Sequence, residues 1–291
     1  MPLPFMAATG LGMRGRAALG ARWRSTLVPV YLAMVILSLA VLAAVLAPLL
    51  VPYSPFRLDP LAAYLAPSPA HPLGSDSFGR DIFSRIVFGA RVSLGAGLAV
   101  SLLSSALGTV LGLTAGLTRA DEGLMRILDG LMAFPGILLA VALVAALGAG
   151  TGNVVIALTV VLTPRTARLV RSVTLAAREE LFVEAARAVG CPFLRLMVRH
   201  ILPTCIAAIV VQATYSFALA VQVEAALSFL GVGTPREIPS WGNMVAEGQV
   251  ALRVAPWVSI FPGSAIVVAV LALNIIGDYL RDRTDPRLRG A

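Results

Sequence analysis

Few side chains in this sequence of 291 residues could perform catalysis or hold a metal ion. Its two histidines and two cysteines match no metal-binding or disulfide pattern: His71, His200, Cys191 and Cys205. Lysine is absent, so the chain cannot form a phosphate-binding P-loop, which requires one. We therefore expect no catalytic residue, no metal site and no bound cofactor, and any ATP that drives this protein must be bound by another subunit.

The longest charged block, residues 178–203, lies between two apolar runs of membrane length, so it must sit in water beside a bilayer. Good helix formers fill residues 178–189, and Gly190 follows where a left-handed residue would end a helix. A second short helix is expected from Pro192, and Pro203 opens the next apolar run. We call residues 178–203 the docking segment, because such an element suits docking better than catalysis.

Seven residues of the docking segment resemble the EAA loop of ABC importer permease subunits. They are Glu184, Ala185, Ala186, Gly190, Ile201, Leu202 and Pro203. The resemblance implies that the segment inserts into a groove of a cytoplasmic ATPase and couples the two subunits. The alternative is an amphipathic loop helix that packs only on its own domain.

Stretches outside the docking segment resemble permeases of the dipeptide, oligopeptide and nickel type: residues 71–76, 79–94, 129–135, 224–244 and 277–289. The resemblance implies an all-α integral membrane protein with six transmembrane helices, a fold like that of type I ABC importer permeases, and a cytoplasmic coupling-helix loop. It also implies a heterodimer with a second homologous permease, and two ATPase subunits that bind ATP and Mg²⁺. An external substrate-binding protein would meet an external contact loop that includes Ser240, Trp241, Gly242 and Met244.

The composition by itself also indicates a membrane protein. Hydrophobic residues make up 58% of the chain and charged residues 13%, and the mean hydropathy is +0.88. Soluble domains contain roughly 25% charged residues. The formal net charge is +8, and the 23 Lys and Arg residues are all arginines, spread mostly over tails and loops between apolar runs. The charge therefore indicates topology and contact with lipid rather than nucleic-acid binding.

Six spans are predicted, near residues 27–51, 93–118, 129–150, 154–172, 203–230 and 256–277. The other predicted parts are a cytoplasmic N-terminal tail (1–26), an external loop with an interfacial helix (52–92), a permease core (93–280) and a cytoplasmic C-terminal tail (281–291). The arginines then expected outside are Arg57, Arg80, Arg85, Arg91, Arg236 and Arg253, and the majority lie inside. We expect a multi-pass protein of a bacterial or archaeal plasma (inner) membrane with both termini cytoplasmic.

Two groups of charged residues beside the spans have two interpretations each. An interfacial helix is favoured for the face formed by Arg80, Asp81, Ser84 and Arg85, with a catalytic role for Asp76 and Asp81 as the alternative. The fourth span must continue past Arg165 to about Ser172 to be long enough. Its arginines at 165, 168 and 171 share one face, and we expect them to snorkel to cytoplasmic headgroups rather than face the bundle interior.

Four residues are candidate path or gating contacts: Asp129, Phe134, Pro135 and Glu224. Pro135 should kink the third span near its cytoplasmic end. For Asp129, stabilisation of a helix N-terminus is favoured over gating. Glu224 is expected near the outer face, where it would contact a substrate amine or form an ion pair within the assembly. In the second span, Gly108, Gly112 and Gly116 recur every fourth residue and predict a ridge that a neighbouring helix approaches closely.

These features predict a permease subunit that forms half of the path of an ATP-driven, binding-protein-dependent importer of di- and oligopeptides. An importer of nickel chelates or of another small solute is the alternative. A secondary transporter would need paired ionisable residues at midplane, and the spans are nearly free of charge. An intramembrane enzyme would need a nucleophile and base or a metal site, and His71 and His200 are expected on opposite sides of the membrane.

Overall fold

The computed structural model describes the backbone of residues 13–284 and the side chains of residues 27–284. Within that part of the chain every regular element is a helix, apart from one isolated bridge between Ser75 and Asp81. Five helices are long and apolar enough to cross a membrane, and one bent pair of helices supplies a potential sixth crossing. The five are α1 (Met13–Val45), α3 (Ile82–Leu117), α6 (Thr151–Arg178), α9 (Leu202–Phe229) and α11 (Trp257–Thr284).

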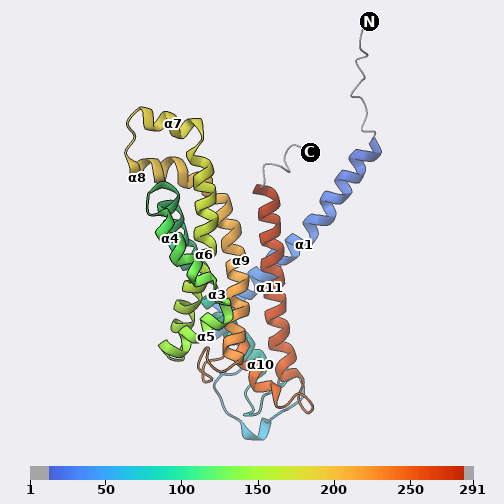
Figure 1. Cartoon of the computed structure of the whole chain (residues 1–291). Coiled ribbons are helices and arrows are strands. Elements are labelled where there is room, and N and C mark those ends of the chain that lie inside the picture. The colour runs from blue at the N-terminus through green and yellow to red at the C-terminus, as the bar shows by residue number, and fades with distance from the viewer. Residues whose placement is uncertain (1–12, 285–291) are drawn as a thin grey trace.

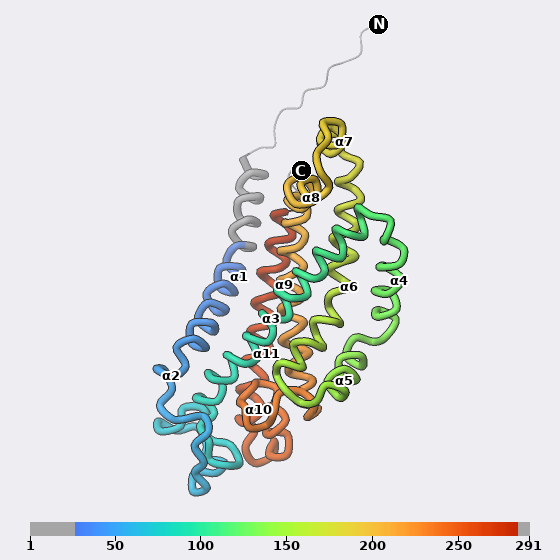
Figure 2. The backbone as a smooth tube through the Cα atoms, turned by 90° about the vertical axis from the view of Figure 1, so that its left-hand side faces the viewer, coloured from blue at the N-terminus to red at the C-terminus, as the bar shows by residue number. Residues whose placement is uncertain are grey.

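The long helices stand side by side, α4 (Asp121–Met132) and α5 (Gly136–Leu147) run along one side of the bundle, and the other short elements lie at its two ends (Figures 1 and 2). α7 (Leu181–Ala188) and α8 (Phe193–Arg195) lie at one end, which we call the docking end. The opposite end, the α10 end, holds α10 (Trp241–Gln249), α2 (Ala47–Leu50) and the loop 51–81 with its 3₁₀ turn Pro60–Ala62. The loop 51–81 and the docking segment lie at opposite ends because the chain between them runs along the bundle in α3, back in the pair α4 and α5, and again in α6.

The third predicted span is broken into two helices. α4 (Asp121–Met132) and α5 (Gly136–Leu147) meet at an angle of 90°, with Pro135 just before α5. The predicted kink at Pro135 is present, but it ends one helix and begins another instead of bending a continuous span. With 12 residues, α5 is about 18 Å long, well short of the roughly 30 Å hydrocarbon core.

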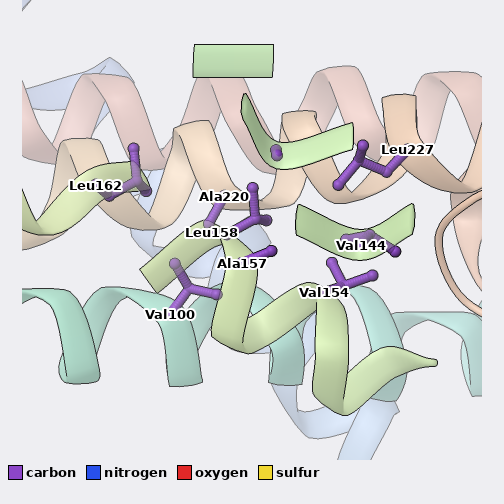
Figure 3. Close-up of a cluster of buried hydrophobic side chains, with 9 residues drawn as sticks. Val100, Val144, Val154, Ala157, Leu158, Leu162, Ala220 and Leu227 are labelled. Carbon is purple, nitrogen blue, oxygen red and sulfur yellow. The ribbon is translucent and has the colours of Figure 1, made fainter. Parts of the chain in front are cut away.

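A buried apolar cluster fastens the short helix α5 to the bundle (Figure 3). Val144 of α5 lies with Val100 of α3, Val154 and Leu158 of α6, and Leu227 of α9. Because these side chains bury their apolar surface against one another, α5 is held in the bundle without crossing a membrane by itself.

The predicted ridge of glycines on α3 is confirmed, and it lies against α6. A Cβ added at Gly108 would come within 2.5 Å of Thr166 Cβ, and one at Gly112 within 2.5 Å of the carbonyl oxygen of Ala167. Gly116 is equally close to Thr174. The backbones of α3 and α6 approach each other closely only because no side chain stands between them.

The helix of the predicted second span begins earlier than expected. α3 runs without a break from Ile82, so the predicted separate interfacial helix is wrong. The carboxylate of Asp81 caps α3 by accepting a hydrogen bond of 2.8 Å from the backbone N–H of Ser84. Arg85 lies in the second turn of α3 and is only 2% exposed, so this face packs against protein rather than lipid headgroups.

Two further helices extend beyond their predicted limits. α6 continues through Pro164 and Arg165, as predicted, and reaches Arg178. α9 is continuous with α8 through a π-helix, Leu196–Ile201, so Pro203 does not begin a new helix. Proline has no N–H to donate to the preceding turn, and the π-turn lies directly before it.

The predicted terminal tails fall partly outside the described residues. Residues 1–12 of the N-terminal tail and residues 285–291 of the C-terminal tail are not described. The first helix begins at Met13 rather than Leu27, and the last, α11, continues to Thr284.

Candidate functional site

The docking segment is a helical hairpin that joins α6 to α9. A turn at Glu179 and Glu180 separates α6 from α7, so the helix predicted from residue 178 begins instead at Leu181. Gly190 has a φ of +78°, the left-handed conformation predicted for it. Its N–H donates to the carbonyl of Arg187 at 2.9 Å, which closes the end of α7.

The inner face of the docking segment is fixed to the membrane helices. Val183 and Ala186 of α7 and Ile201 of the π-helix are buried with Leu113 of α3 and Val170 of α6. Cys205 of α9 belongs to the same cluster, so the docking segment is packed against three long helices and a force on α7 would be transmitted to them.

The outer face of the docking segment is rich in apolar side chains that no described residue covers. Leu181 is 79% exposed and Val189 84% exposed. We call this face the docking surface; it comprises Leu181, Phe182, Glu184, Ala185, Val189, Phe193 and Leu194. Clustered exposed apolar residues of this kind mark an interaction surface.

The seven predicted coupling residues divide between the two faces. Glu184, Ala185, Gly190 and Pro203 are exposed, Leu202 is half-buried, and Ala186 and Ile201 are buried. The buried pair positions the segment and the exposed residues are available to a partner. Their coupling role remains a prediction.

Two arginines of α6 bind α4. Arg168 Nη2 lies 2.6 Å from Asp129 Oδ1, and the Arg171 guanidinium contacts both carboxylate oxygens of Asp121. Acidic partners within the chain thus bind these two arginines, and because both also remain partly exposed, their snorkelling to headgroups stays a prediction. Asp129 lies late in α4, where it cannot stabilise the helix N-terminus, so that favoured role is wrong.

The candidate gating residues Phe134 and Pro135 lie at the break between α4 and α5. Phe134 is 62% exposed and Pro135 is exposed too. Both are therefore accessible from outside this chain, and their role as path or gating contacts remains a prediction, as does that of Asp129.

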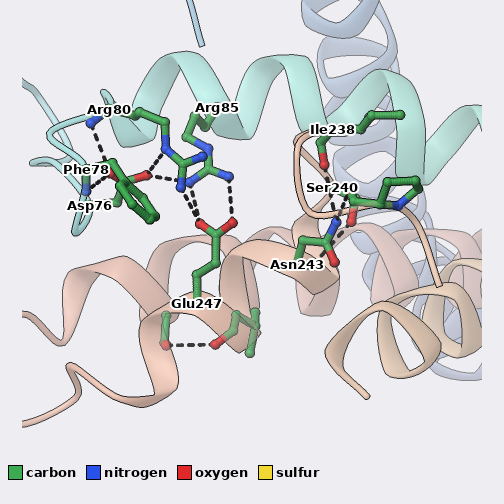
Figure 4. Close-up of polar contacts among 11 residues, drawn as sticks. Asp76, Phe78, Arg80, Arg85, Ile238, Ser240, Asn243 and Glu247 are labelled. Atoms are coloured by element: carbon green, nitrogen blue, oxygen red, sulfur yellow. Dashed lines mark hydrogen bonds and ion pairs between the residues drawn. The ribbon is translucent and has the colours of Figure 1, made fainter. Parts of the chain in front are cut away.

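At the α10 end, four charged side chains form a buried cluster that joins the loop 51–81 to α10 (Figure 4). Arg80 lies 2.7 Å from both Asp76 and Glu247, and Arg85 lies 2.5 Å from Glu247 and also contacts Asp76. We call Asp76, Arg80, Arg85 and Glu247 the ion cluster. Asp76 is 1% exposed and bound by two arginines, which supports a structural role rather than the catalytic alternative.

Asp81 also has a structural position. Besides capping α3, it lies 3.0 Å from His71 Nδ1, and the His71 ring stacks on Tyr53. The Ser84 hydroxyl donates a hydrogen bond of 2.7 Å to the same carboxylate, so Asp81 ties two parts of the loop to each other and to the first turn of α3.

The predicted external contact loop is buried. Ser240, Trp241 and Met244 are at most 2% exposed, and Gly242 packs against Ala225 and Ser228. The indole Nε1 of Trp241 donates to the carbonyl of Ile86 at 3.0 Å. In this conformation these residues anchor α10 on α3 and α9 and are not accessible to an external partner, which corrects the expectation.

Glu224 is enclosed by hydroxyl groups. Its carboxylate accepts hydrogen bonds from Ser93 at 3.1 Å, Ser228 at 2.9 Å and Thr234 at 3.0 Å, and the residue is 0% exposed. Neither a substrate amine nor another subunit reaches it in this conformation. The carboxylate instead sits in a hydroxyl pocket that joins α3, α9 and the chain after α9, and its role as a path contact remains a prediction.

One member of the ion cluster was missed from the sequence. Glu247 pairs with Arg80 and Arg85 across more than 160 positions, and nothing local indicates that contact. Arg165 was recognised from the sequence as sharing a face with Arg168 and Arg171, but unlike them it is not paired with an acidic residue of α4.

The comparisons with known proteins agree with one another. The profile of the family described as "Binding-protein-dependent transport system inner membrane component" matches residues 104–290. A permease protein of Brucella suis biovar 1 (strain 1330), named for peptide transport, is 47% identical over 257 residues, 88% of this chain and 87% of that protein. A dipeptide transport system permease protein of Alkalihalophilus pseudofirmus is 43% identical, covering 88% of this chain and 85% of that protein.

Two other similar proteins extend this pattern. A glutathione transport system permease protein of Escherichia coli O6:K15:H31 is 46% identical over 77% of this chain and 75% of that protein. A chain of the inward-facing MetNI methionine ABC transporter has a TM-score of 0.51 at 21% identity, covering 70% of this chain and 98% of its own length. This last likeness shows a shared fold.

Proposed function

This chain belongs to the inner membrane components of binding-protein-dependent transport systems, and we propose that it is one of two membrane subunits of an importer of di- and oligopeptides. The family resemblance and the all-α permease fold expected from the sequence are both confirmed. The chain is thus a multi-pass inner-membrane permease of an ABC importer, and its substrate, partners and coupling are the subject of the proposal.

The docking segment is the observation that carries the proposal. It presents an exposed apolar face that includes Glu184, and its inner face is packed on α3, α6 and α9. In the proposed assembly two ATPase subunits bind ATP and Mg²⁺ and engage one docking surface on each permease. This chain contributes no catalytic residue, and closure of the ATPases moves the docking segment as a rigid unit.

The movement has a direct route into the membrane. The helical rod from Phe193 to Phe229 runs without a break from the docking segment to the α10 end, and α6 provides the second rod. Tilting the two rods together would switch the path between outward and inward access. The second permease completes the path, and an external binding protein delivers the substrate at the α10 end.

Peptides are favoured as substrates because relatives that cover most of the chain are named for peptide, dipeptide and glutathione transport. The arginine bias of the sequence supports a cytoplasmic docking end and cytoplasmic termini. Nickel chelates and other small solutes are the competing substrate class.

Uptake in cells that lack this chain tests the proposal. The cells receive a defined mixture of di- and oligopeptides and nickel, and accumulated solutes are measured by mass spectrometry. We expect selective loss of peptide uptake, which the wild-type gene restores and a Glu184→Arg variant, present in the membrane at the same level, does not. Loss of nickel uptake with intact peptide uptake, in a strain without a second peptide importer, would contradict the proposed substrate.

A further inference from the structure

Arg165 is a charged residue in the middle of a membrane helix that no described residue neutralises. α6 runs from Thr151 to Arg178, so Arg165 lies near its midpoint. Its side chain is exposed, and it has no hydrogen bond or ion pair with any residue that the structure describes. Ionisable residues at such depth are costly and usually mark a substrate or ion pathway.

The chain neutralises the other two arginines on this face but not Arg165. Arg168 and Arg171 reach Asp129 and Asp121 of α4. Beyond the 90° break, the sequence of α5 holds no charged residue, and Glu224 of α9 is enclosed by hydroxyl groups. The ion pairs of Arg168 and Arg171 therefore lie one and two helical turns closer to the docking end than Arg165 does.

Arg165 lines a cavity of about 210 Å³ between α5, α6 and α9. The other lining residues are apolar or glycine, including Ile137 of α5, Leu158 of α6, and Leu219 and Val223 of α9. The cavity thus offers one positive charge among apolar walls. That combination suits a ligand with a carboxylate and variable, largely apolar substituents.

We propose that Arg165 binds the terminal carboxylate of the peptide as it passes through this cavity. A guanidinium stays charged in apolar surroundings and binds a carboxylate through two parallel hydrogen bonds. The inference rests on the proposed peptide substrate, because every unmodified linear peptide carries that group. A carboxylate of the second permease is the competing partner, but the cavity is already walled by three helices of this chain and has room for the end of a ligand.

Transport of a dipeptide and of its C-terminal amide by the reconstituted importer tests the contact. The dipeptide is chosen so that the external binding protein binds both the free acid and the amide. We expect Arg165→Gln to reduce uptake of the acid at least tenfold and to leave uptake of the amide unchanged. The Arg165→Lys variant should keep part of the preference for the acid. An equal loss for both forms, as expected for a structural contact with the second permease, overturns the proposal, and so does unchanged uptake of the acid.

Thiol protection provides a second measurement that does not depend on transport of the amide. Val223 is replaced by cysteine in a Cys191→Ser background, while Cys205 is buried and can stay. We expect the dipeptide to slow modification of Val223→Cys during turnover at least fivefold, and this protection to disappear when Arg165→Gln is added. Protection that is absent, or that persists in the double variant, contradicts the site. A wild-type importer that takes up no peptide refutes the proposed function instead.

Discussion

Arg85 illustrates how single residues at the α10 end are held. Its guanidinium is almost fully buried, and two carboxylates, Asp76 and Glu247, meet it there. A buried charge is tolerable only with such partners, so the contact between the loop and α10 depends on all members of the ion cluster. The spacing of Arg85 and its neighbours predicted an interfacial helix because that pattern is local. The contact with Glu247 could not be predicted in this way, because Glu247 is 162 positions away in the chain.

Removing Arg85 should therefore destabilise the protein. We expect Arg85→Met to lower the stability by about 3 kcal/mol, since Arg80 remains to pair with the two carboxylates and keeps the loss near the lower end for buried pairs. A thermal melt of the purified protein in detergent measures the change. The matched control is Arg126→Met, whose partner Glu122 is 83% exposed, so its melting temperature should not change. Equal shifts for the two variants would contradict the role of the ion cluster.

The glycine ridge and the docking hairpin show which elements can be predicted from sequence. The four-residue spacing of Gly108, Gly112 and Gly116 and the helix stop at Gly190 are local properties, and both were predicted correctly. The burial of Trp241 and the hydroxyl pocket of Glu224 were not, because they depend on how α10 packs on α3 and α9. The pairing of Arg168 with Asp129 likewise depends on the position of α4 after the break at Pro135.

Two identical substitutions within α3 test the close contact with α6. We expect Gly112→Ala to cost about 1–3 kcal/mol, because the added Cβ meets the backbone oxygen of Ala167, which has little freedom to move. Gly95 has no atom within 4 Å of a built Cβ, so Gly95→Ala should be neutral or slightly stabilising. Chemical denaturation in micelles compares the two variants. A Gly112→Ala protein as stable as the Gly95→Ala protein would contradict the close approach.

At the scale of the whole molecule, the arrangement separates a docking end from an α10 end. The alternation of apolar spans and arginine-rich loops predicted this separation, since each crossing reverses the side of the membrane. The exposed apolar docking surface lies at one end, and the ion cluster, α10 and the loop 51–81 lie at the other (Figures 1 and 4). We propose that the first faces the cytoplasm and the second the outside.

Labelling with a membrane-impermeant thiol reagent tests this orientation. Val250, just after α10, is 88% exposed, and Cys191 lies in the docking segment. In spheroplasts we expect Val250→Cys, in a Cys191→Ser background, to react at once. The native Cys191 should react only after the membrane is permeabilised, and Cys205, which is buried, serves as the unreactive reference. The reverse pattern would place the docking end outside.

The most direct test of coupling through the docking segment is to measure ATP hydrolysis and peptide uptake in the same proteoliposomes for two variants of one residue. Gly190 has open space around it but a φ of +78°, which asparagine tolerates and valine does not. We expect Gly190→Asn to keep most of the uptake per ATP hydrolysed and Gly190→Val to lose at least nine-tenths of it while the assembled ATPase still hydrolyses ATP. Unimpaired coupled uptake by Gly190→Val would contradict the account.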